Sequence, residues 1–170
     1  MGLVSNMRIL VISDTHGHDR DIDRLIDVVA PDRIYHLGDS ENEGRYLLNV
    51  AKCPVELVRG NCDWSSSLPY EVVLEVGKHV LLLTHGHRER CKASYDGLVK
   101  RAREVGADYI LYGHTHQPEI EEYKGCTIIN PGSLTYPRQY NRRGTYGVLN
   151  VDKDGEIEAA VRYVDMLPVK

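Results

Sequence analysis

The first third of the chain alternates short apolar runs with amphipathic stretches. The apolar runs predict three strands, at residues 8–13, 33–37 and 55–58. The amphipathic stretches predict two helices, near residues 19–29 and over 42–51. Asp19 is a suitable N-cap for the first helix, and Pro31 a suitable stop. Because nearly continuous apolar strands alternate with helices, this region predicts a parallel sheet covered on both faces.

The pattern changes in the second half, where turn signals separate most of the apolar runs. Gly77-Lys78 joins two predicted strands, at 70–76 and 79–83, in a hairpin. A helix is predicted over 92–105, ending at Gly106. Further strands are predicted at 108–112, 119–123, 127–129, 144–151 and 156–164. The whole pattern predicts a mixed α/β fold with two stacked sheets.

Length and composition narrow the class of protein. The 170 residues contain no linker or repeat, which predicts one domain over 1–170, with 1–6 as a possible leader or alternative start. The net charge of −4 argues against stable nucleic-acid binding by bulk phosphate neutralisation. The sequence has no secretory signal and no apolar run of roughly 20 residues, and its four cysteines are scattered. We therefore expect a cytoplasmic protein with free thiols and no membrane contact.

Polar clusters follow five of the predicted strands directly. They are Asp14-Thr-His16, Gly38-Asp39, Gly60-Asn61-Cys62-Asp63, Thr84-His85-Gly-His87 and Gly113-His114-Thr-His116. Ligands of open α/β sheets bind outside the carboxyl ends of the strands. We therefore expect all five clusters to converge at one edge.

The residue types in these clusters point to metal ions. Imidazole and carboxylate suit Mn, Fe, Co, Ni or Zn, and alternate residues of Asp-x-His and His-x-His would face one side of an extended segment. The seven candidate ligands are Asp14, His16, Asp39, Asn61, His85, His114 and His116. Seven are too many for one catalytic ion with an open position. They divide between two ions if one carboxylate bridges them, an arrangement that suits in-line phosphoryl displacement.

The ordered series D-x-H, GD, GNCD, THGH and GHTH, followed by NPGS, resembles the calcineurin-like metallophosphoesterases. It is most similar to their small bacterial and archaeal phosphodiesterase branch, over about residues 8–165. The resemblance implies a four-layer α/β/β/α sandwich, in which helices flank two mixed sheets. It also implies two divalent transition-metal ions, with Mn first and Ni, Fe, Zn or Co as alternatives.

The resemblance further implies a role for each ligand. Asp14, His16 and His116 would hold one ion, Asn61, His85 and His114 the other, and Asp39 would bridge them. A bridging hydroxide would attack phosphorus. The turn 130–133 (NPGS) would position the loop that carries His114 and His116.

One departure concerns the proton donor for the leaving group. Many family members have His where this chain has Cys62, and a thiol is a poor replacement for an imidazole. Asp63, His87 or His18 could partly fill the role, or no residue does. We therefore assign catalytic roles to Asn61, which could also orient the phosphate, and to Asp63 and His87.

Several other residues have ordinary structural interpretations. His36 is expected to pack within a strand, and His79 to be a solvated hairpin residue. Trp64 could shape the pocket wall or a subunit contact. Two basic clusters fit a phosphate-receiving rim and a solvated face equally well; they are Arg88, Arg90, Lys92 and Arg138, Arg142, Arg143.

The sequence thus favours a dinuclear metal-dependent phosphodiesterase that acts on a small phosphate ester. One alternative is a catalytically weak scaffold that resembles the retromer subunit vacuolar protein sorting 29, which the complete ligand set disfavours. A nuclease is the other, disfavoured by net acidity and short length. The Tyr-rich segment 136–146 is compatible with a homo-oligomer.

Overall fold

The computed structural model describes residues 6–168, so most of the predicted leader, residues 1–5, lies outside the described residues. Its helices are α1 (Ile22–Val29), α2 (Arg45–Val50), α3 (Asp96–Val105) and a 3-10 helix (Val164–Met166). Its strands are β1 (Met7–Ile12), β2 (Arg33–His36), β3 (Val55–Leu57), β4 (Glu71–Val76), β5 (His79–Thr84), β6 (Tyr109–Leu111), β7 (Pro118–Tyr123), β8 (Cys126–Pro131), β9 (Thr145–Val151) and β10 (Ile157–Tyr163). Within this range, no helix is long and apolar enough to cross a membrane.

Two five-stranded sheets form the centre of the molecule. The first has the order β10-β9-β1-β2-β3, in which β1, β2 and β3 are parallel, as the opening pattern predicted. The second has the order β4-β5-β6-β8-β7, in which β5, β6 and β8 are parallel. Antiparallel strands complete each sheet, so both are mixed.

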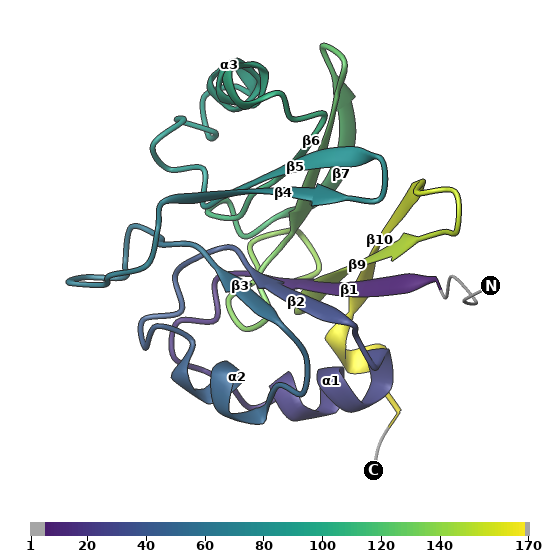
Figure 1. The fold of residues 1–170 in the computed structure, drawn as a ribbon. Helices are drawn as coiled ribbons and strands as arrows, with labels where there is room; N and C mark the ends of the chain where they lie inside the picture. Colours follow the sequence, from purple (N-terminus) through teal and green to yellow (C-terminus); the bar gives the residue numbers. More distant parts are fainter. Residues whose placement is uncertain (1–5, 169–170) are drawn as a thin grey trace.

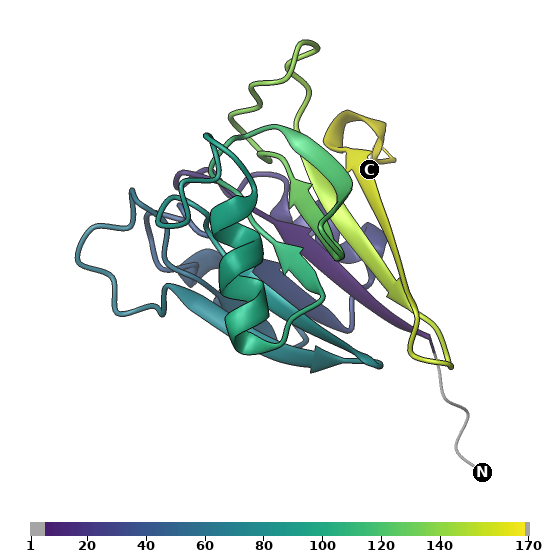
Figure 2. The ribbon, with the colours of Figure 1, turned by 90° about the horizontal axis from the view of Figure 1, so that it is seen from above.

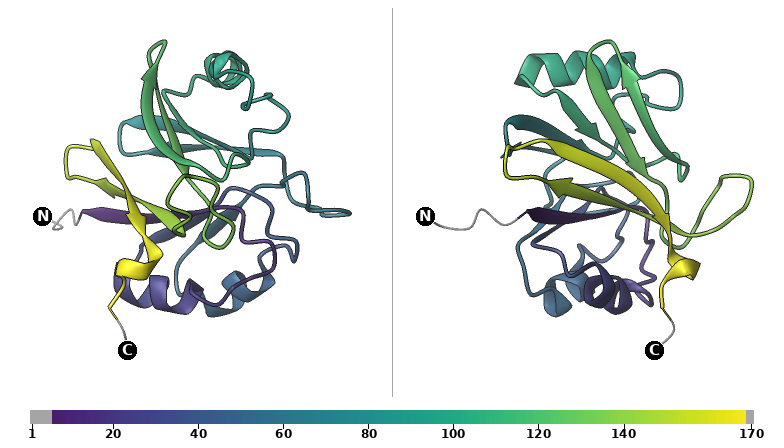
Figure 3. Two further views of the ribbon diagram at one scale, coloured as in Figure 1. Left: turned by 180° about the vertical axis from the view of Figure 1, so that it is seen from behind. Right: turned by 90° about the vertical axis from the view of Figure 1, so that its right-hand side faces the viewer.

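The sheets pack face to face, and helices cover their outer faces (Figure 1; Figure 3). Along β1, Ile9 and Val11 enter the apolar layer between the sheets, whereas Leu10 and Ile12 face the layer under α1 and α2. Leu82 of β5 packs toward α3 on the opposite outer face. Figure 2 shows α3 lying across the second sheet. This alternation confirms the predicted sandwich of two mixed sheets with flanking helices.

All three α-helices begin later than their sequence pattern predicts, and α2 begins at Arg45 rather than at residue 42. Helix α1 begins at Ile22 rather than near Asp19, and Asp21 precedes it without a side-chain cap. Helix α3 begins at Asp96 rather than at residue 92. The preceding residues form turns instead, and the Cys91 N–H donates to the Gly86 carbonyl at 3.1 Å.

The expectation of a solvated His79 is wrong. Its side chain is only 14% exposed, its Nδ1 lies 2.6 Å from Asp108 and its Nε2 lies 3.3 Å from Glu156. The ring also meets the edge of Tyr109. His79 therefore joins the start of β5 to two neighbouring segments through both of its nitrogens.

Candidate metal centre

The five polar clusters lie where β1, β2, β3, β5 and β6 end, and backbone hydrogen bonds tie their loops together. The Asp14 N–H donates to the Gly38 carbonyl at 3.1 Å, and the His16 N–H to the Asp39 carbonyl at 2.9 Å. Within the second sheet, the Gly113 N–H donates to the His85 carbonyl at 3.2 Å, and between the sheets the His114 N–H donates to Asp14 Oδ2 at 3.1 Å. These bonds bring the loops of both sheets together at one edge, as predicted.

Two buried carboxylates form the centre of the cluster. Asp14 Oδ1 lies 3.1 Å from His116 Nε2 and 3.9 Å from His85 Nε2. Asp39 Oδ2 lies 3.3 Å from His85 Nε2 and 3.8 Å from His16 Nε2. Each carboxylate therefore approaches histidines of both predicted ion sites, whereas the sequence analysis gave only Asp39 a bridging position.

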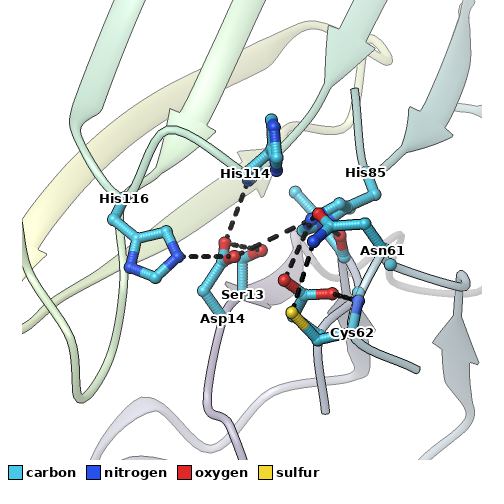
Figure 4. Close-up of polar contacts among 12 residues, drawn as sticks. Ser13, Asp14, Asn61, Cys62, His85, His114 and His116 are labelled. Carbon is cyan, nitrogen blue, oxygen red and sulfur yellow. Dashed lines mark hydrogen bonds and ion pairs between the residues drawn. The ribbon is translucent and has the colours of Figure 1, made fainter. Parts of the chain in front are cut away.

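The histidines surround these carboxylates, as Figure 4 shows for the Asp14–His116 contact. Burial opposes ionisation of both carboxyl groups, but the contacts of Asp14 with His116 and of Asp39 with His85 hold both pKa values below their usual range. Both groups are therefore anionic at neutral pH. Two neighbouring buried carboxylates are costly unless a positive charge compensates them, so this arrangement favours a bound cation.

Three of the predicted histidine ligands are oriented by their Nδ1 atoms. His85 Nδ1–H donates to the Leu37 carbonyl at 2.7 Å, and His116 Nδ1–H to the Tyr136 carbonyl at 2.7 Å. His16 Nδ1 lies 2.5 Å from a Glu41 carboxylate oxygen. These bonds leave each Nε2 as the atom directed at the carboxylates, which is the usual arrangement around a histidine metal ligand.

Glu41 is a positioning residue that the sequence analysis missed. It follows Asp39 by two residues, so its spacing beside a candidate ligand was the available signal. Its own backbone has a positive φ of 60°. Its carboxylate orients the His16 ring through Nδ1, just as backbone carbonyls orient the rings of His85 and His116.

Asn61 and His114 lie on the other side of the cluster. Asn61 Oδ1 is 3.1 Å from His85 Nε2, close enough to share a cation with it. The His114 ring packs against His85 and His87, with centroids 5.1 and 6.1 Å away, and is not among the groups of close ligand atoms. Burial and the neighbouring His85 lower the pKa of His114 to about 4, so its imidazole is neutral at pH 7.

The Asp-x-His and His-x-His segments are not extended, which corrects the sequence interpretation. Asp14 and His16 have φ values of 54° and 47°, and His114 and His116 have values of 66° and 59°. Asp39 shares this left-handed conformation, at 54°. Non-glycine residues adopt it at a cost of order 1 kcal/mol or more, and such residues cluster at functional sites.

Glycines allow the loops to approach the carboxylates closely. A Cβ on Gly60 would lie 2.0 Å from Asp39 Oδ1, and one on Gly113 would lie 2.1 Å from Ser13 Oγ. No side chain fits at either distance. These two positions therefore require glycine for steric reasons.

Cys62 reaches the cluster, although it is not among the seven predicted ligands. Its Sγ belongs to a group of close ligand atoms with His16 and Asp39, and its backbone N–H donates to Asp39 Oδ1 at 2.7 Å. Burial and the Asp39 charge raise the pKa of the thiol to about 11. Without a metal, Cys62 is therefore a neutral thiol at the edge of the site.

Asp63 lies beneath the cluster rather than facing it. Its side chain accepts hydrogen bonds from the N–H groups of Asp39, Gly60 and Glu41, at 2.9, 2.7 and 2.6 Å, and from Ser40 Oγ at 3.4 Å. It is 3% exposed. Both carboxylate oxygens therefore accept hydrogen bonds, and these bonds join the loop of Asp39 to the loop of Gly60.

The other two candidate proton donors lie at the sides of the site. His87 is half-buried, its Nδ1 has no partner among the described residues, and burial together with His85 lowers its pKa. His18 is exposed and donates from Nδ1 to the His16 carbonyl at 2.8 Å. The lowered pKa of His87 favours its neutral form, which is a poor general acid.

His36 packs inside the fold, as predicted. Its Nδ1 accepts the Gly38 N–H at 3.2 Å, so its Nε2 donates to Thr15 Oγ1 at 3.0 Å. Complete burial lowers its pKa to about 4. A neutral His36 thus supports the loop between Asp14 and His16.

The NPGS turn supports two loops of the site. Asn130 Nδ2 donates to the Gly113 carbonyl and to Thr115 Oγ1, both at 3.0 Å, which confirms the predicted contact with the His114–His116 loop. Ser133 Oγ also donates to the Asp14 carbonyl at 2.9 Å. The sequence analysis did not foresee this second contact.

The donor set fits divalent metal ions. Asp14 Oδ1 is a buried anionic oxygen whose nearest polar neighbour in the described chain is His116 Nε2 at 3.1 Å, and it accepts no backbone or hydroxyl hydrogen bond, an arrangement that favours a cation at this point. The close ligand atoms form three groups: Asp14 with His16 and His116, Asp14 with Asp39 and His85, and His16 with Asp39 and Cys62. The three groups share members and consist mainly of imidazole and carboxylate donors, which suit transition-metal ions.

Known proteins share both the sequence and the fold. The family model of the calcineurin-like phosphoesterase superfamily domain matches residues 7–154. The probable metallophosphoesterase YsnB of Bacillus subtilis is 36% identical over 161 residues, covering 94% of this chain and 91% of that protein. Vacuolar protein sorting-associated protein 29 of Schizosaccharomyces pombe is 34% identical over 137 residues, covering 76% of this chain and 73% of that protein.

A solved structure from Streptococcus pneumoniae, described as a predicted phosphoesterase, superposes with a TM-score of 0.81 at 29% identity. The alignment covers 96% of this chain and 92% of that one. Together with the candidate ligand groups, these relatives support a metal-dependent phosphoesterase. The extent of the family match, which covers β1 to β9 and every ligand loop, shows that this chain belongs to the calcineurin-like phosphoesterase superfamily.

Proposed function

We propose that this chain is a phosphodiesterase that uses two divalent metal ions, with Mn²⁺ as the preferred metal. The observation that carries the proposal is the pair of buried carboxylates, Asp14 and Asp39, each within 4 Å of histidines on both sides of the cluster. One ion is assigned to the side of His16 and His116. The other is assigned to the side of His85, with Asn61 and His114.

The bound ions would supply Lewis-acid polarisation of the phosphate and a water of lowered pKa. The chain's own residues hold the imidazoles by their Nδ1 atoms and keep the two carboxylates anionic. Asn61 is exposed beside His85, so its amide is available to a phosphate oxygen as well as to a cation. In the net reaction, a water oxygen forms a bond to phosphorus, the bond to the leaving alcohol breaks, and that alcohol gains a proton.

The leaving alcohol receives little help from an acid side chain. Asp63 accepts hydrogen bonds with both oxygens, His87 has a lowered pKa, and Cys62 has a pKa raised to about 11. We therefore expect the hydrolysis rate of aryl phosphodiesters to depend steeply on the pKa of the leaving phenol. A linear free-energy plot over a series of substituted phenyl esters measures this dependence. A flat plot would show that an efficient general acid exists.

The similarity to vacuolar protein sorting 29 raises the scaffold function as a second candidate. The enzyme is favoured because all seven predicted ligands are present and several are held by hydrogen bonds to neighbouring groups. The scaffold would not need Glu41 or the Leu37 carbonyl to orient imidazoles. These supports therefore favour a working metal site over a scaffold.

The test is hydrolysis of bis(p-nitrophenyl) phosphate by chelator-treated protein before and after addition of Mn²⁺. We expect activity only after Mn²⁺ is added, faster turnover of this diester than of p-nitrophenyl phosphate, and about two ions bound per chain by calorimetry. Absence of hydrolysis by folded, Mn²⁺-loaded protein would contradict the enzyme and favour the scaffold. Binding of a single ion by an active protein would overturn the two-ion assignment alone.

A further inference from the structure

An open cleft of about 480 Å³ adjoins one side of the metal centre. It is lined by His16, His18, Glu41, His116, Tyr136, Pro137, Arg138 and Arg142. His16 and His116 belong both to the metal centre and to the lining of the cleft. A phosphodiester bound at the metal centre would therefore place one of its ester substituents at the mouth of the cleft. The volume lies within the usual range for small-molecule sites.

The cleft carries two unpaired positive charges. Arg138 and Arg142 are exposed, and neither guanidinium has a hydrogen bond or ion pair with another residue of the described chain. The one carboxylate lining the cleft belongs to Glu41, which is engaged by His16 Nδ1 at 2.5 Å. The cleft therefore lacks a free internal counter-ion for its two arginines.

Two other basic residues near the site have side-chain contacts outside this cleft. Arg143 binds Asp165 through two nitrogens, at 2.8 and 2.6 Å, and stacks on Tyr163. Arg88 lies over the Tyr70 ring at 4.4 Å, in a region shared with Glu71. Among the members of the two basic clusters noted in the sequence, Arg138 and Arg142 are the ones that line this cleft.

The segment that bears these arginines is fixed to the metal centre. The Arg138 N–H donates to the His116 carbonyl at 3.0 Å, and His116 Nδ1–H donates to the Tyr136 carbonyl at 2.7 Å. Ser133 Oγ accepts the Tyr136 N–H at 2.7 Å. The Tyr136 ring stands edge-on to His16 and to His18. The segment that carries both arginines is therefore hydrogen-bonded directly to His116, a candidate metal ligand.

We propose that this cleft is a subsite for a second phosphate group of the substrate, a deeper assignment that rests on the proposed phosphodiesterase function. The preferred substrates would be phosphodiesters in which one ester substituent carries a terminal phosphate, as in an ester of a nucleoside bisphosphate. Guanidinium groups recognise phosphate through charge-assisted hydrogen bonds. Tyr136 and Pro137 supply an apolar wall for the part of the substituent that links the two phosphates.

The test compares two chromogenic esters that differ only in the second phosphate. They are the p-nitrophenyl ester of thymidine 5′-phosphate and the same ester carrying a 3′-phosphate. With Mn²⁺-loaded wild-type protein, we expect kcat/KM to be about tenfold higher for the 3′-phosphorylated ester. In the double variant Arg138→Gln/Arg142→Gln, this ratio should fall to about one. The matched control Arg162→Gln, an exposed arginine of β10 outside this cleft, should keep the ratio.

A binding measurement separates this inference from the function on which it rests. Calorimetry with Mn²⁺-loaded protein should show about tenfold tighter binding of thymidine 3′,5′-bisphosphate than of thymidine 5′-phosphate, and the double variant should lose the difference. If neither ester is hydrolysed but the binding preference holds, the phosphodiesterase proposal fails and the subsite stands. If wild-type protein hydrolyses both esters equally, or the double variant keeps the preference, the subsite assignment is wrong.

Discussion

Replacing Asp39 by asparagine is expected to abolish metal-dependent hydrolysis, with a fall in kcat/KM of about 10³-fold or more. Asp39 Oδ2 lies 3.3 Å from His85 Nε2 and 3.8 Å from His16 Nε2, so its charge serves both sides of the cluster. Loss of several kcal/mol of metal-supplied transition-state stabilisation corresponds to a rate decrease of this size. Steady-state kinetics with bis(p-nitrophenyl) phosphate and Mn²⁺ calorimetry measure both consequences.

Asparagine is preferred to alanine at this position because it can retain the bond to the Cys62 backbone. Asp39 Oδ1 accepts the Cys62 N–H at 2.7 Å, and an amide oxygen can do the same. The fold should therefore survive while the charge is lost. Asp154→Asn, at the exposed turn before β10, is the charge-matched control and should leave activity and Mn²⁺ binding unchanged. Normal Mn²⁺ affinity in Asp39→Asn would show that this carboxylate is not a ligand.

The convergence of the polar loops within each sheet could be predicted because it follows from the direction of the parallel strands, and the stacking of the two sheets then brings the two sets of loops together. Five polar clusters follow strands, and parallel strands of one sheet end at the same edge. The nearly continuous apolar run of β1 also predicted that both faces of the sheet are covered: Ile9 and Val11 lie between the sheets, and Leu10 lies on the outer side. Local pattern was sufficient for these features.

Other features depend on contacts between distant residues, which a single sequence does not encode locally. The left-handed conformation of Asp14 and His116 is imposed by the loops around them, since both residue types ordinarily favour negative φ. The residue that precedes α1 is Asp21 rather than the predicted Asp19, because helix boundaries depend on surrounding contacts as well as on propensity. The orientation of His16 by Glu41 likewise exists only once two loops are folded together.

Asp63 illustrates the same limit for function. Its place in a motif beside Asn61 suggested a catalytic acid, because sequence shows adjacency but not the direction of a side chain. In the fold, it accepts backbone bonds from the loops of Asp39 and Gly60. Its importance is therefore expected to be structural support of the ligands, a role that experiment can distinguish from proton transfer.

The substitution Asp63→Asn is expected to reduce both stability and activity. One of the two carboxylate oxygens becomes an NH₂ group that must face an N–H or O–H donor, because all four present partners are donors. Leaving buried donors without an acceptor costs about 1–3 kcal/mol for each group. We expect the free energy of unfolding to fall by about 3 kcal/mol, and kcat/KM to fall about 10–100-fold, as is typical when the support of a metal ligand is removed.

Chemical denaturation measures the first effect, and Asp165→Asn is its control. Asp165 pairs with Arg143 at the exposed surface, and such pairs contribute little, so no measurable change in stability is expected.

The dependence of rate on leaving-group pKa decides between support and proton donation at Asp63. A residue that only positions the loops affects esters of good and poor leaving groups alike, so Asp63→Asn should lower every rate by a similar factor and leave the slope unchanged. A proton donor matters most for poor leaving groups, because a good one departs without protonation. A slope that becomes markedly steeper in Asp63→Asn would identify Asp63 as the general acid and overturn the positioning role. An unchanged slope with weaker Mn²⁺ binding would place its effect on the ligand loops, where its hydrogen bonds lie.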